Sequence, residues 1–218
     1  MAVSMRTQWN KIFGIEGKVF TKPQPDIPKI SKLFKKQGVK KILDLGCGTG
    51  RHLVFFAKKG FDVYGIDIAK QGIEISRRWL KKEGLKANLK ISDVYKKLPY
   101  QDSFFDAIIS IRVVNHGKIE DIRKLIKEME RILKPKGLIF VTTIKSEKSK
   151  KGRWKYKQVA PRTIIPINGP EKGLLHYYFN KAIIKKEFKN FKIDKIWLDS
   201  KDSHASSRHY AFIGELKK

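Results

Sequence analysis

The sequence predicts an α/β fold, in which a doubly wound, mostly parallel sheet of seven strands ends in an antiparallel C-terminal hairpin strand. Short apolar runs alternate with stretches of helical periodicity between residues 41 and 143, which is typical of βαβ units. The run Phe105–Ile111 is apolar almost throughout, as expected for a strand that is buried on both faces. With 218 residues the chain is long enough for one large hydrophobic core, so we expect a single domain.

Each predicted element follows from its local pattern. The first forty residues contain three closely spaced prolines and are expected to be irregular, apart from a short helix over 30–37. Further helices are predicted from residue 53 to Gly60, over 73–83 and over 119–133, and each is followed by glycine or proline. The strands between them are predicted over 41–45, 61–66, 89–93, 105–111 and 138–143. After a long insert we expect a helix over 181–188 and two hairpin strands over 191–197 and 210–216.

The charge of the chain is unusual. Lys and Arg number 49 against 21 Asp and Glu, which gives a net charge of +28. Such an excess attracts polyanions, so RNA is a possible partner, but a generally lysine-rich surface would give the same count. The chain has no apolar run of about 20 residues, no apolar N-terminal segment and a single cysteine, Cys47. We therefore expect a cytoplasmic protein without a membrane span, a disulfide or a bound metal, and we make no prediction of its oligomeric state.

A glycine-rich turn follows the first predicted strand. Gly46, Gly48 and Gly50 lie between that strand and the next helix, where the backbone must turn tightly and approach a ligand. The pyrophosphate-binding fingerprint of dinucleotide folds needs its third glycine one position later, where this chain has Arg51. The spacing therefore indicates a ligand without a pyrophosphate, and an ordinary strand-to-helix turn is the alternative.

Two acidic residues follow predicted strands at the same edge of the sheet. Asp67 ends the second strand, where a carboxylate can accept hydrogen bonds from both hydroxyls of a ribose. Asp93 ends the third strand, where it can accept from the exocyclic amine of adenine while the amide of Val94 donates to the ring. Both acids would also suit a turn or a helix N-cap.

Residues 42–141 resemble the class I methyltransferases, which have a Rossmann-like fold and use S-adenosylmethionine. The resemblance rests on the glycine turn, the two strand-end acids, residues 98–108 and the turn over 133–137, in which Lys136 replaces a glycine. Within this superfamily, residues 50–63 and 208–213 are similar to tellurite-resistance-type and related small-molecule methyltransferases.

The resemblance implies S-adenosylmethionine as the cofactor and suggests which residues contact it. The glycines would line its methionine part, Asp44 and Arg51 would flank its amino and carboxylate groups, and Asp67 would hold the ribose. The residues assigned to the cofactor in this way are Asp44, Gly46, Gly48, Gly50, Arg51, Asp67, Ile68, Asp93, Val94 and Arg112. Residues 41–143 would form the binding core, and residues 144–218 would carry the insert and the substrate-side elements.

The N-terminal segment, residues 1–40, would cover the cofactor. Its candidate contacts are Trp9, Phe13, Lys18 and Phe20, although a docked tail would look the same in the sequence.

The acceptor side is less well marked. His116 follows the fourth strand, where acceptors usually lie, and it is the candidate catalytic residue, although a loop histidine without a role fits equally. His176, Tyr177 and Tyr178 form an aromatic patch that could wall the acceptor pocket or belong to the core. The insert over 145–157 carries seven basic residues with Trp154 and Tyr156 between them, which suits either an RNA contact or a solvated lid.

The motifs that are missing narrow the function. No Asn-Pro-Pro-aromatic or Asp-Pro-Pro-aromatic tetrapeptide follows the fourth strand, which argues against the adenine and cytosine amino-methyltransferases that carry it. Cys47 lies inside the glycine turn, which disfavours carbon-5 pyrimidine methylation through a cysteine nucleophile. We therefore predict a methyltransferase for a small-molecule acceptor. RNA methylation and a non-catalytic, cofactor-binding protein are the alternatives.

Overall fold

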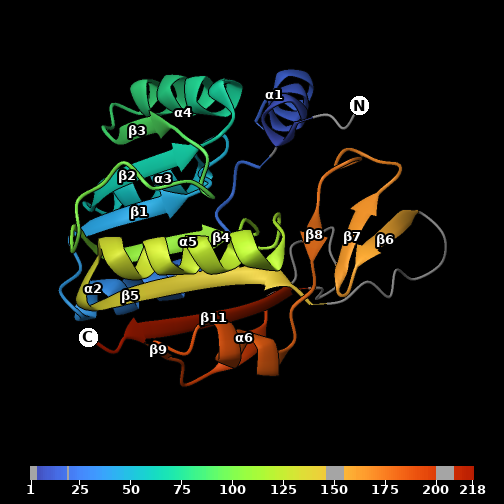
Figure 1. Ribbon diagram of the computed structural model, residues 1–218. Coiled ribbons are helices and arrows are strands. Elements are labelled where there is room, and N and C mark those ends of the chain that lie inside the picture. Colours follow the sequence, from blue (N-terminus) through green and yellow to red (C-terminus); the bar gives the residue numbers. More distant parts are fainter. Residues whose placement is uncertain (1–3, 19, 146–154, 200–208) are drawn as a thin grey trace.

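The computed structural model describes residues 4–18, 20–145, 155–199 and 209–218 (Figure 1). A central sheet runs through the molecule and carries helices on both faces. Its strands are β1 (Lys41–Leu45), β2 (Asp62–Asp67), β3 (Asn88–Ile91), β4 (Phe105–Ile111), β5 (Leu133–Ile144), β9 (Phe191–Lys192), β10 (Ile196–Leu198) and β11 (His209–Leu216). The helices are α1 (Met5–Glu16), α2 (Ile27–Lys36), α3 (Arg51–Lys58), α4 (Lys70–Lys82), α5 (Ile119–Ile132) and α6 (Lys181–Glu187).

The strand order is β10-β11-β5-β4-β1-β2-β3, with β9 also paired to β11. The neighbours from β3 to β5 are parallel, whereas β11 is antiparallel to β5, β9 and β10. The predicted α/β fold with a mostly parallel sheet and an antiparallel C-terminal end is therefore confirmed. The chain winds outward from β1 in both directions, so the order reverses between β1 and β4. The carboxyl ends of strands at such a switch point are where open α/β sheets bind ligands.

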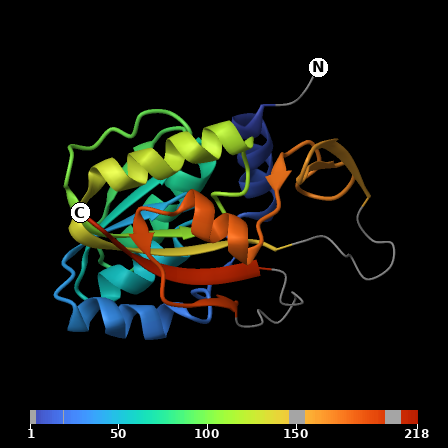
Figure 2. The same cartoon turned by 60° about the horizontal axis from the view of Figure 1, so that its bottom comes forward.

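Apolar side chains are buried on both faces of the sheet. On one face α5 contributes Ile122, Leu125, Ile126 and Met129, whose helical spacing forms a continuous apolar stripe, and α6 lies beside it (Figure 2). The opposite face is covered by α2, α3 and α4, where the rings of Phe34 and Phe56 lie 6.2 Å apart between centroids. None of the helices in the described residues is both long and apolar enough to cross a membrane.

The N-terminal region is more ordered than its sequence predicts. The expected irregular segment contains α1, which begins after the N-cap Ser4, whose side chain accepts a hydrogen bond from the backbone amide of Thr7 at 3.2 Å. The prolines follow this helix, and Pro28 falls in the first turn of α2, where a missing amide hydrogen costs nothing. The expectation of an irregular first thirty residues was wrong because the prolines all lie beyond α1.

The C-terminal half also differs from the expectation in two places. The strand predicted over 191–197 is divided into β9 and β10, which pair with different parts of β11, so the main sheet has eight strands and not seven. The insert forms a second, antiparallel sheet of β6 (Tyr156–Ala160), β7 (Thr163–Pro166) and β8 (His176–Tyr177), which was not predicted. Every residue of β6 is exposed, so this strand shows no apolar alternation in the sequence.

The small sheet and α1 lie at the same end of the molecule. Figure 1 shows both beyond the ends toward which the β1 and β2 arrows point, which are the carboxyl ends of the parallel strands. α1 and the insert are in contact there: the side-chain amide of Gln8 in α1 donates a hydrogen bond to the carbonyl of Pro170 in the insert at 2.7 Å. The candidate site therefore has the sheet as its floor and these two segments as its walls.

Candidate active site

In the glycine turn between β1 and α3, two of the three glycines are required because a side chain there would clash with a neighbouring residue. A Cβ atom on Gly46 would lie 2.3 Å from a methyl group of Val113, and one on Gly50 would lie 2.7 Å from the hydroxyl of Ser76. Gly48 has more space but, like the other two, has a positive φ, here 53°. The amides of Gly46 and Cys47 both donate to the carbonyl of Ile66, which fixes the turn against the end of β2.

Asp67 at the end of β2 holds this turn from the other side. One of its carboxylate oxygens accepts from the amide of Gly48 and the other from the amide of Ala69, both at 2.8 Å. Burial raises the pKa of Asp67, and the hydrogen bonds from these two amides oppose that shift. The residue is buried but still lines the cavity described below.

Asp44 is more deeply buried, within β1. Its Oδ2 lies 3.8 Å from Nδ1 of His52 and has no hydrogen-bond partner among the described residues. Burial raises the pKa of Asp44 to about 8, although the nearby Arg51 acts to lower it. His52 accepts a hydrogen bond from the amide of Gln24 through Nε2, and burial lowers its pKa well below the usual value. Asp44 and His52 therefore form a neutral buried pair under the glycine turn.

A cavity of about 660 Å³ lies at the carboxyl ends of the strands. Its volume is within the range of sites that take a cofactor together with a small ligand. It brings together ten of the fourteen site residues predicted from the sequence, namely Gly46, Gly48, Arg51, Asp67, Ile68, Asp93, Val94, Arg112, His116 and His176. Asp44 and Gly50 are not part of its lining.

Two further predicted residues, Tyr177 and Tyr178, are also absent from the cavity lining. Tyr177 packs in the main core beside Phe179, with ring centroids 5.1 Å apart. The backbone of Tyr178 exchanges hydrogen bonds with Arg162 of the insert. Of the aromatic patch, His176 alone lines the cavity, and Tyr177, the next residue of β8, points to the opposite face of that strand.

Asp93 and Arg112 line the cavity with local backbone roles as well. Asp93 accepts from the amide of Tyr95 at 3.0 Å, so the turn role expected as an alternative is present alongside the cavity position. Arg112 follows β4 with a φ of 60°, an uncommon value for a residue other than glycine, and its guanidinium lies 3.5 Å from Asp199. The turn at Arg112 brings Val113 against Gly46, so the loops after β1 and β4 fit each other at the switch point.

The N-terminal segment lines the cavity with residues of α1 and the loop behind it. Trp9 and Phe13 stack with ring centroids 5.5 Å apart, and Trp9 contacts the edge of the His116 ring at the same distance. Phe20 also lines the cavity, whereas Lys18 lies over the ring of Trp79 and is directed elsewhere. Trp9, Ile12 and Phe13 have the i, i+3, i+4 spacing of a buried helix face. This spacing is the sequence pattern that predicts α1.

The insert supplies the part of the site that sequence reasoning missed. Tyr156, Pro166, Asn168, Pro170 and Glu171 all line the cavity opposite the glycine turn. No motif marks them, since their positions depend on how the small sheet docks. Residues 146–154 of the predicted basic segment, with Trp154, lie outside the described residues, and Arg208 of the C-terminal resemblance also does.

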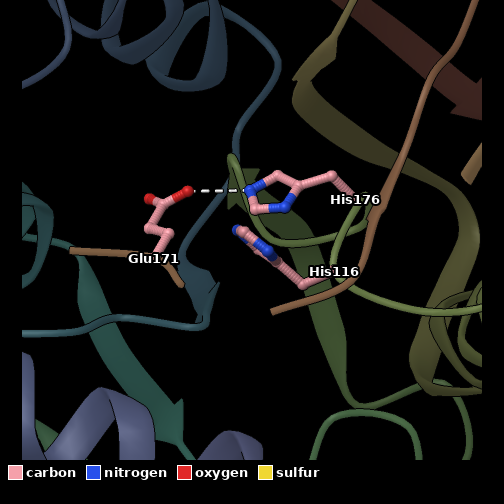
Figure 3. A group of neighbouring side chains, drawn as sticks. All are labelled: His116, Glu171 and His176. Carbon is pink, nitrogen blue, oxygen red and sulfur yellow. Dashed lines mark hydrogen bonds and ion pairs between the residues drawn. The ribbon is translucent and has the colours of Figure 1, made fainter. Parts of the chain in front are cut away.

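Three of the lining residues form a compact cluster: His116, Glu171 and His176. One ligand-capable atom from each lies within 4.8 Å of the other two (Figure 3). Nε2 of His176 lies 2.7 Å from a carboxylate oxygen of Glu171, and the two imidazole rings meet edge to face with centroids 4.6 Å apart. Burial lowers the pKa of His116 to about 4, and His176 acts in the same direction. Burial acts to raise the pKa of Glu171, but the hydrogen bond to His176 and the nearby histidines lower it to about 2.

The charge of the cavity is opposite to that of the chain. Its described lining holds four carboxylates, from Glu16, Asp67, Asp93 and Glu171, against the two guanidinium groups of Arg51 and Arg112. A chain with a net charge of +28 thus places an acidic lining at the end of its sheet. Acidic lining favours a cationic ligand over an anionic one.

Comparisons with known proteins identify a methyltransferase domain in this chain. Residues 42–137 match the family model described as "Methyltransferase domain". A "Ubiquinone biosynthesis O-methyltransferase" of Pelagibacter ubique is 34% identical over 104 residues, which cover 48% of this chain and 42% of that protein. Another protein of that name, from Rickettsia typhi, is 30% identical over 64% of this chain and 56% of its own length. The chain therefore spans about half the length of the curated relatives that it matches.

A solved structure shows the same fold. The S-adenosylmethionine-dependent methyltransferase from Clostridium acetobutylicum superposes with a TM-score of 0.68 at 14% identity, covering 96% of this chain and 99% of the other. The strand order, the glycine turn, the strand-end acids and the matching family model lead to one assignment. Residues 42–137 of this chain therefore form a methyltransferase domain, and it is similar to those of the class I, S-adenosylmethionine-dependent superfamily.

Proposed function

We propose that this chain transfers the methyl group of S-adenosylmethionine to an oxygen atom of a small-molecule acceptor. The observation that carries the proposal is a single cavity with two distinct ends. One end is lined by the glycine turn, Asp67 and Asp93, and the other by His116, Glu171 and His176. The names of the curated relatives, which are O-methyltransferases, favour oxygen as the acceptor atom.

The residues at the first end fit the cofactor. The absence of side chains at Gly46 and Gly48 leaves the backbone open to the cavity, and the carboxylate of Asp67 has lone pairs beyond those used by the two amides. Asp44 holds a buried oxygen without a hydrogen-bond partner among the described residues, close to the turn that would carry the methionine part. The acidic lining also suits a ligand that carries both a sulfonium and an ammonium group.

The bound cofactor would supply an electrophilic methyl group on a positively charged sulfur. In the transfer, a carbon–oxygen bond to the acceptor forms while the carbon–sulfur bond breaks and its electron pair stays on sulfur. The acceptor hydroxyl would lose its proton in the transfer, and His116, His176 and Glu171 are titratable groups at that end of the cavity. The protein mainly has to align the two reactants and exclude water, a role that fits α1 and the insert.

Two features favour a small acceptor over RNA. The cavity is walled by α1 and the insert, which are joined by the hydrogen bond between Gln8 and Pro170. Its acidic lining would repel a phosphate backbone, whatever the charge on the outer surface.

The test is transfer from methyl-labelled S-adenosylmethionine to either a metabolite extract or total RNA, with the whole purified chain. We expect label in small molecules and none in RNA. Asp67→Asn keeps the size of the side chain, removes its charge and replaces one of the two acceptors of the turn with a donor, and it should weaken cofactor binding at least about 10-fold, as judged by calorimetry. Asp62→Asn, at the exposed start of the same strand, is the matched control and should bind as the wild type does.

Labelled RNA would overturn the small-molecule proposal in favour of RNA methylation. Cofactor binding without label in either fraction would favour the non-catalytic alternative. If Asp67→Asn binds the cofactor as tightly as the wild type, the proposed orientation of the cofactor is wrong.

A further inference from the structure

We propose that His116, His176 and Glu171 bind one divalent transition-metal ion, such as Zn²⁺, at the acceptor end of the cavity. The three residues come from separate segments: His116 lies in the loop after β4, Glu171 lies in the loop between β7 and β8, and His176 is the first residue of β8. Two imidazoles and one carboxylate form a ligand set that Zn²⁺ and Fe²⁺ sites use, with the remaining positions left for water or substrate. The proposed binding stands on geometry alone, whereas its role in the reaction rests on the proposed function.

The geometry needs little adjustment to close around an ion. The three ligand-capable atoms already lie within 4.8 Å of one another, and Figure 3 shows the His116 ring directed at the hydrogen-bonded pair of Glu171 and His176. Ligands at about 2.0–2.2 Å from Zn²⁺ require separations of somewhat over 3 Å between them. Rotations of the Glu171 side chain, which is 45% exposed, can supply that movement.

In both histidines Nδ1 faces a backbone carbonyl, so Nε2 is the ring nitrogen that a metal would use. Nδ1 of His116 lies 3.3 Å from the carbonyl of Leu175, and Nδ1 of His176 lies 3.1 Å from the carbonyl of Leu174. A carbonyl only accepts, so with an ion bound each Nδ1 would carry the proton and each neutral ring would present its lone pair on Nε2. Histidine ligands of metals are typically oriented in this way by a backbone carbonyl or a carboxylate.

The contact between His176 and Glu171 already places a carboxylate beside the two imidazoles. Nε2 of His176 lies 2.7 Å from a carboxylate oxygen of Glu171, which is the distance of a hydrogen bond. An ion held by both groups would replace that hydrogen bond, and the two ligand atoms would then separate to somewhat over 3 Å. The ring of His116 meets the ring of His176 edge to face, so it would supply the third ligand to the same ion.

An ion bound there would be open to the cavity, because all three residues line it. The local excess of carboxylates over guanidinium groups makes this the part of a basic chain where a cation is best tolerated. An acceptor hydroxyl bound to the ion would lose its proton to water more readily, and its oxygen would then attack the methyl group. The acceptor class that fits is therefore a small molecule with an acidic hydroxyl, such as a phenol.

The test is metal binding by the untagged whole chain after it has been stripped with a chelator. Titration with Co²⁺, followed by its visible absorption, and with Zn²⁺, followed by calorimetry, should each give one equivalent per chain. His116→Asn, His176→Asn and Glu171→Gln should each weaken binding by at least about 10-fold, since even the loss of a group that only orients a ligand costs that much. Glu171→Gln keeps an oxygen beside His176, so folding is expected to persist, and circular dichroism checks it.

The matched control is His209→Asn, which removes another histidine from the same cavity lining but not from the cluster. Its Co²⁺ spectrum and stoichiometry should equal those of the wild type. Binding below half an equivalent, or binding that the three cluster variants leave unchanged, would overturn the proposed site. Cofactor affinity measured on the same stripped sample separates the two proposals: cofactor binding without metal binding refutes only the site, and metal binding without cofactor binding refutes only the proposed function.

Discussion

The two ends of the cavity differ in how the chain builds them. The cofactor end comes from a turn of five residues after β1 and from single residues at the ends of neighbouring parallel strands. The acceptor end is assembled from α1, the loop after β4 and the insert, which are separated by more than a hundred residues in places. Local segments on a shared framework keep their geometry whatever is attached to the sheet, whereas the second end can change with the substrate.

The largest expected contrast is between the sheet core and the N-terminal wall. Phe56 is fully buried among residues of α2, α3 and β2, so Phe56→Ala should cost about 3–5 kcal/mol in the free energy of unfolding. Phe13 belongs to a small separate cluster with Trp9, Ile12, Ala69 and Ile75, and it faces the cavity. Phe13→Ala should therefore cost much less stability and should weaken cofactor binding instead.

Urea denaturation and calorimetric titration of both variants measure this contrast. A stability loss in Phe13→Ala as large as that in Phe56→Ala would show that α1 belongs to the cooperative core. Unchanged cofactor affinity in Phe13→Ala would make α1 a docked segment, as the alternative interpretation of its sequence has it.

A second prediction concerns the turn at the cofactor end. Gly46→Ala introduces a Cβ 2.3 Å from Val113 at a positive φ, and it should cost about 3 kcal/mol in the free energy of unfolding. Gly84→Ala is the matched control, because Gly84 has a φ of 65° with nothing within 4 Å of the added atom. That variant isolates the backbone cost, which should be about 1–2 kcal/mol. If urea denaturation shows equal losses in the free energy of unfolding for the two variants, the loop after β4 moves away from the added methyl group without an energetic penalty.

The same contrast explains which features the sequence could predict. The existence of the strands and their mostly parallel direction followed from the alternating pattern, and the glycine turn, Asp67 and Asp93 followed from motifs whose spacing is local. Glu171 could not be found, because a lone glutamate in an insert carries no pattern until β8 brings it beside His176. Helix α1 was not predicted because three closely spaced prolines favour an irregular segment. The helical spacing of Trp9, Ile12 and Phe13 lies before those prolines. The division into β9 and β10 has no signal in residues 193–195 that we can identify.

The smallest expected effect tests the electrostatics of the cofactor end. Burial raises the pKa of Asp44 to about 8, whereas an unfolded aspartate titrates near 3.8. Between these values the folded chain holds a proton that the unfolded chain has released, so the free energy of unfolding contributed by Asp44 is lost as the pH rises. The full slope for one proton is about 1.4 kcal/mol per pH unit, and a slope of about 1 kcal/mol per unit is expected between pH 5 and pH 7.

Asp44→Asn should remove that slope, because the amide does not titrate, and the variant should be more stable than the wild type at pH 7 and more nearly equal to it at pH 5. Urea denaturation of the cofactor-free protein at both pH values measures the difference, and Asp62→Asn serves as the exposed acidic control. Cofactor binding adds a second measurement: an ammonium group brought near Asp44 would favour its ionised form, so binding at pH 7 should release a proton. Calorimetry in buffers of different ionisation enthalpy detects that proton. Proton release that persists in Asp44→Asn would assign it to another group and would place the ammonium away from β1.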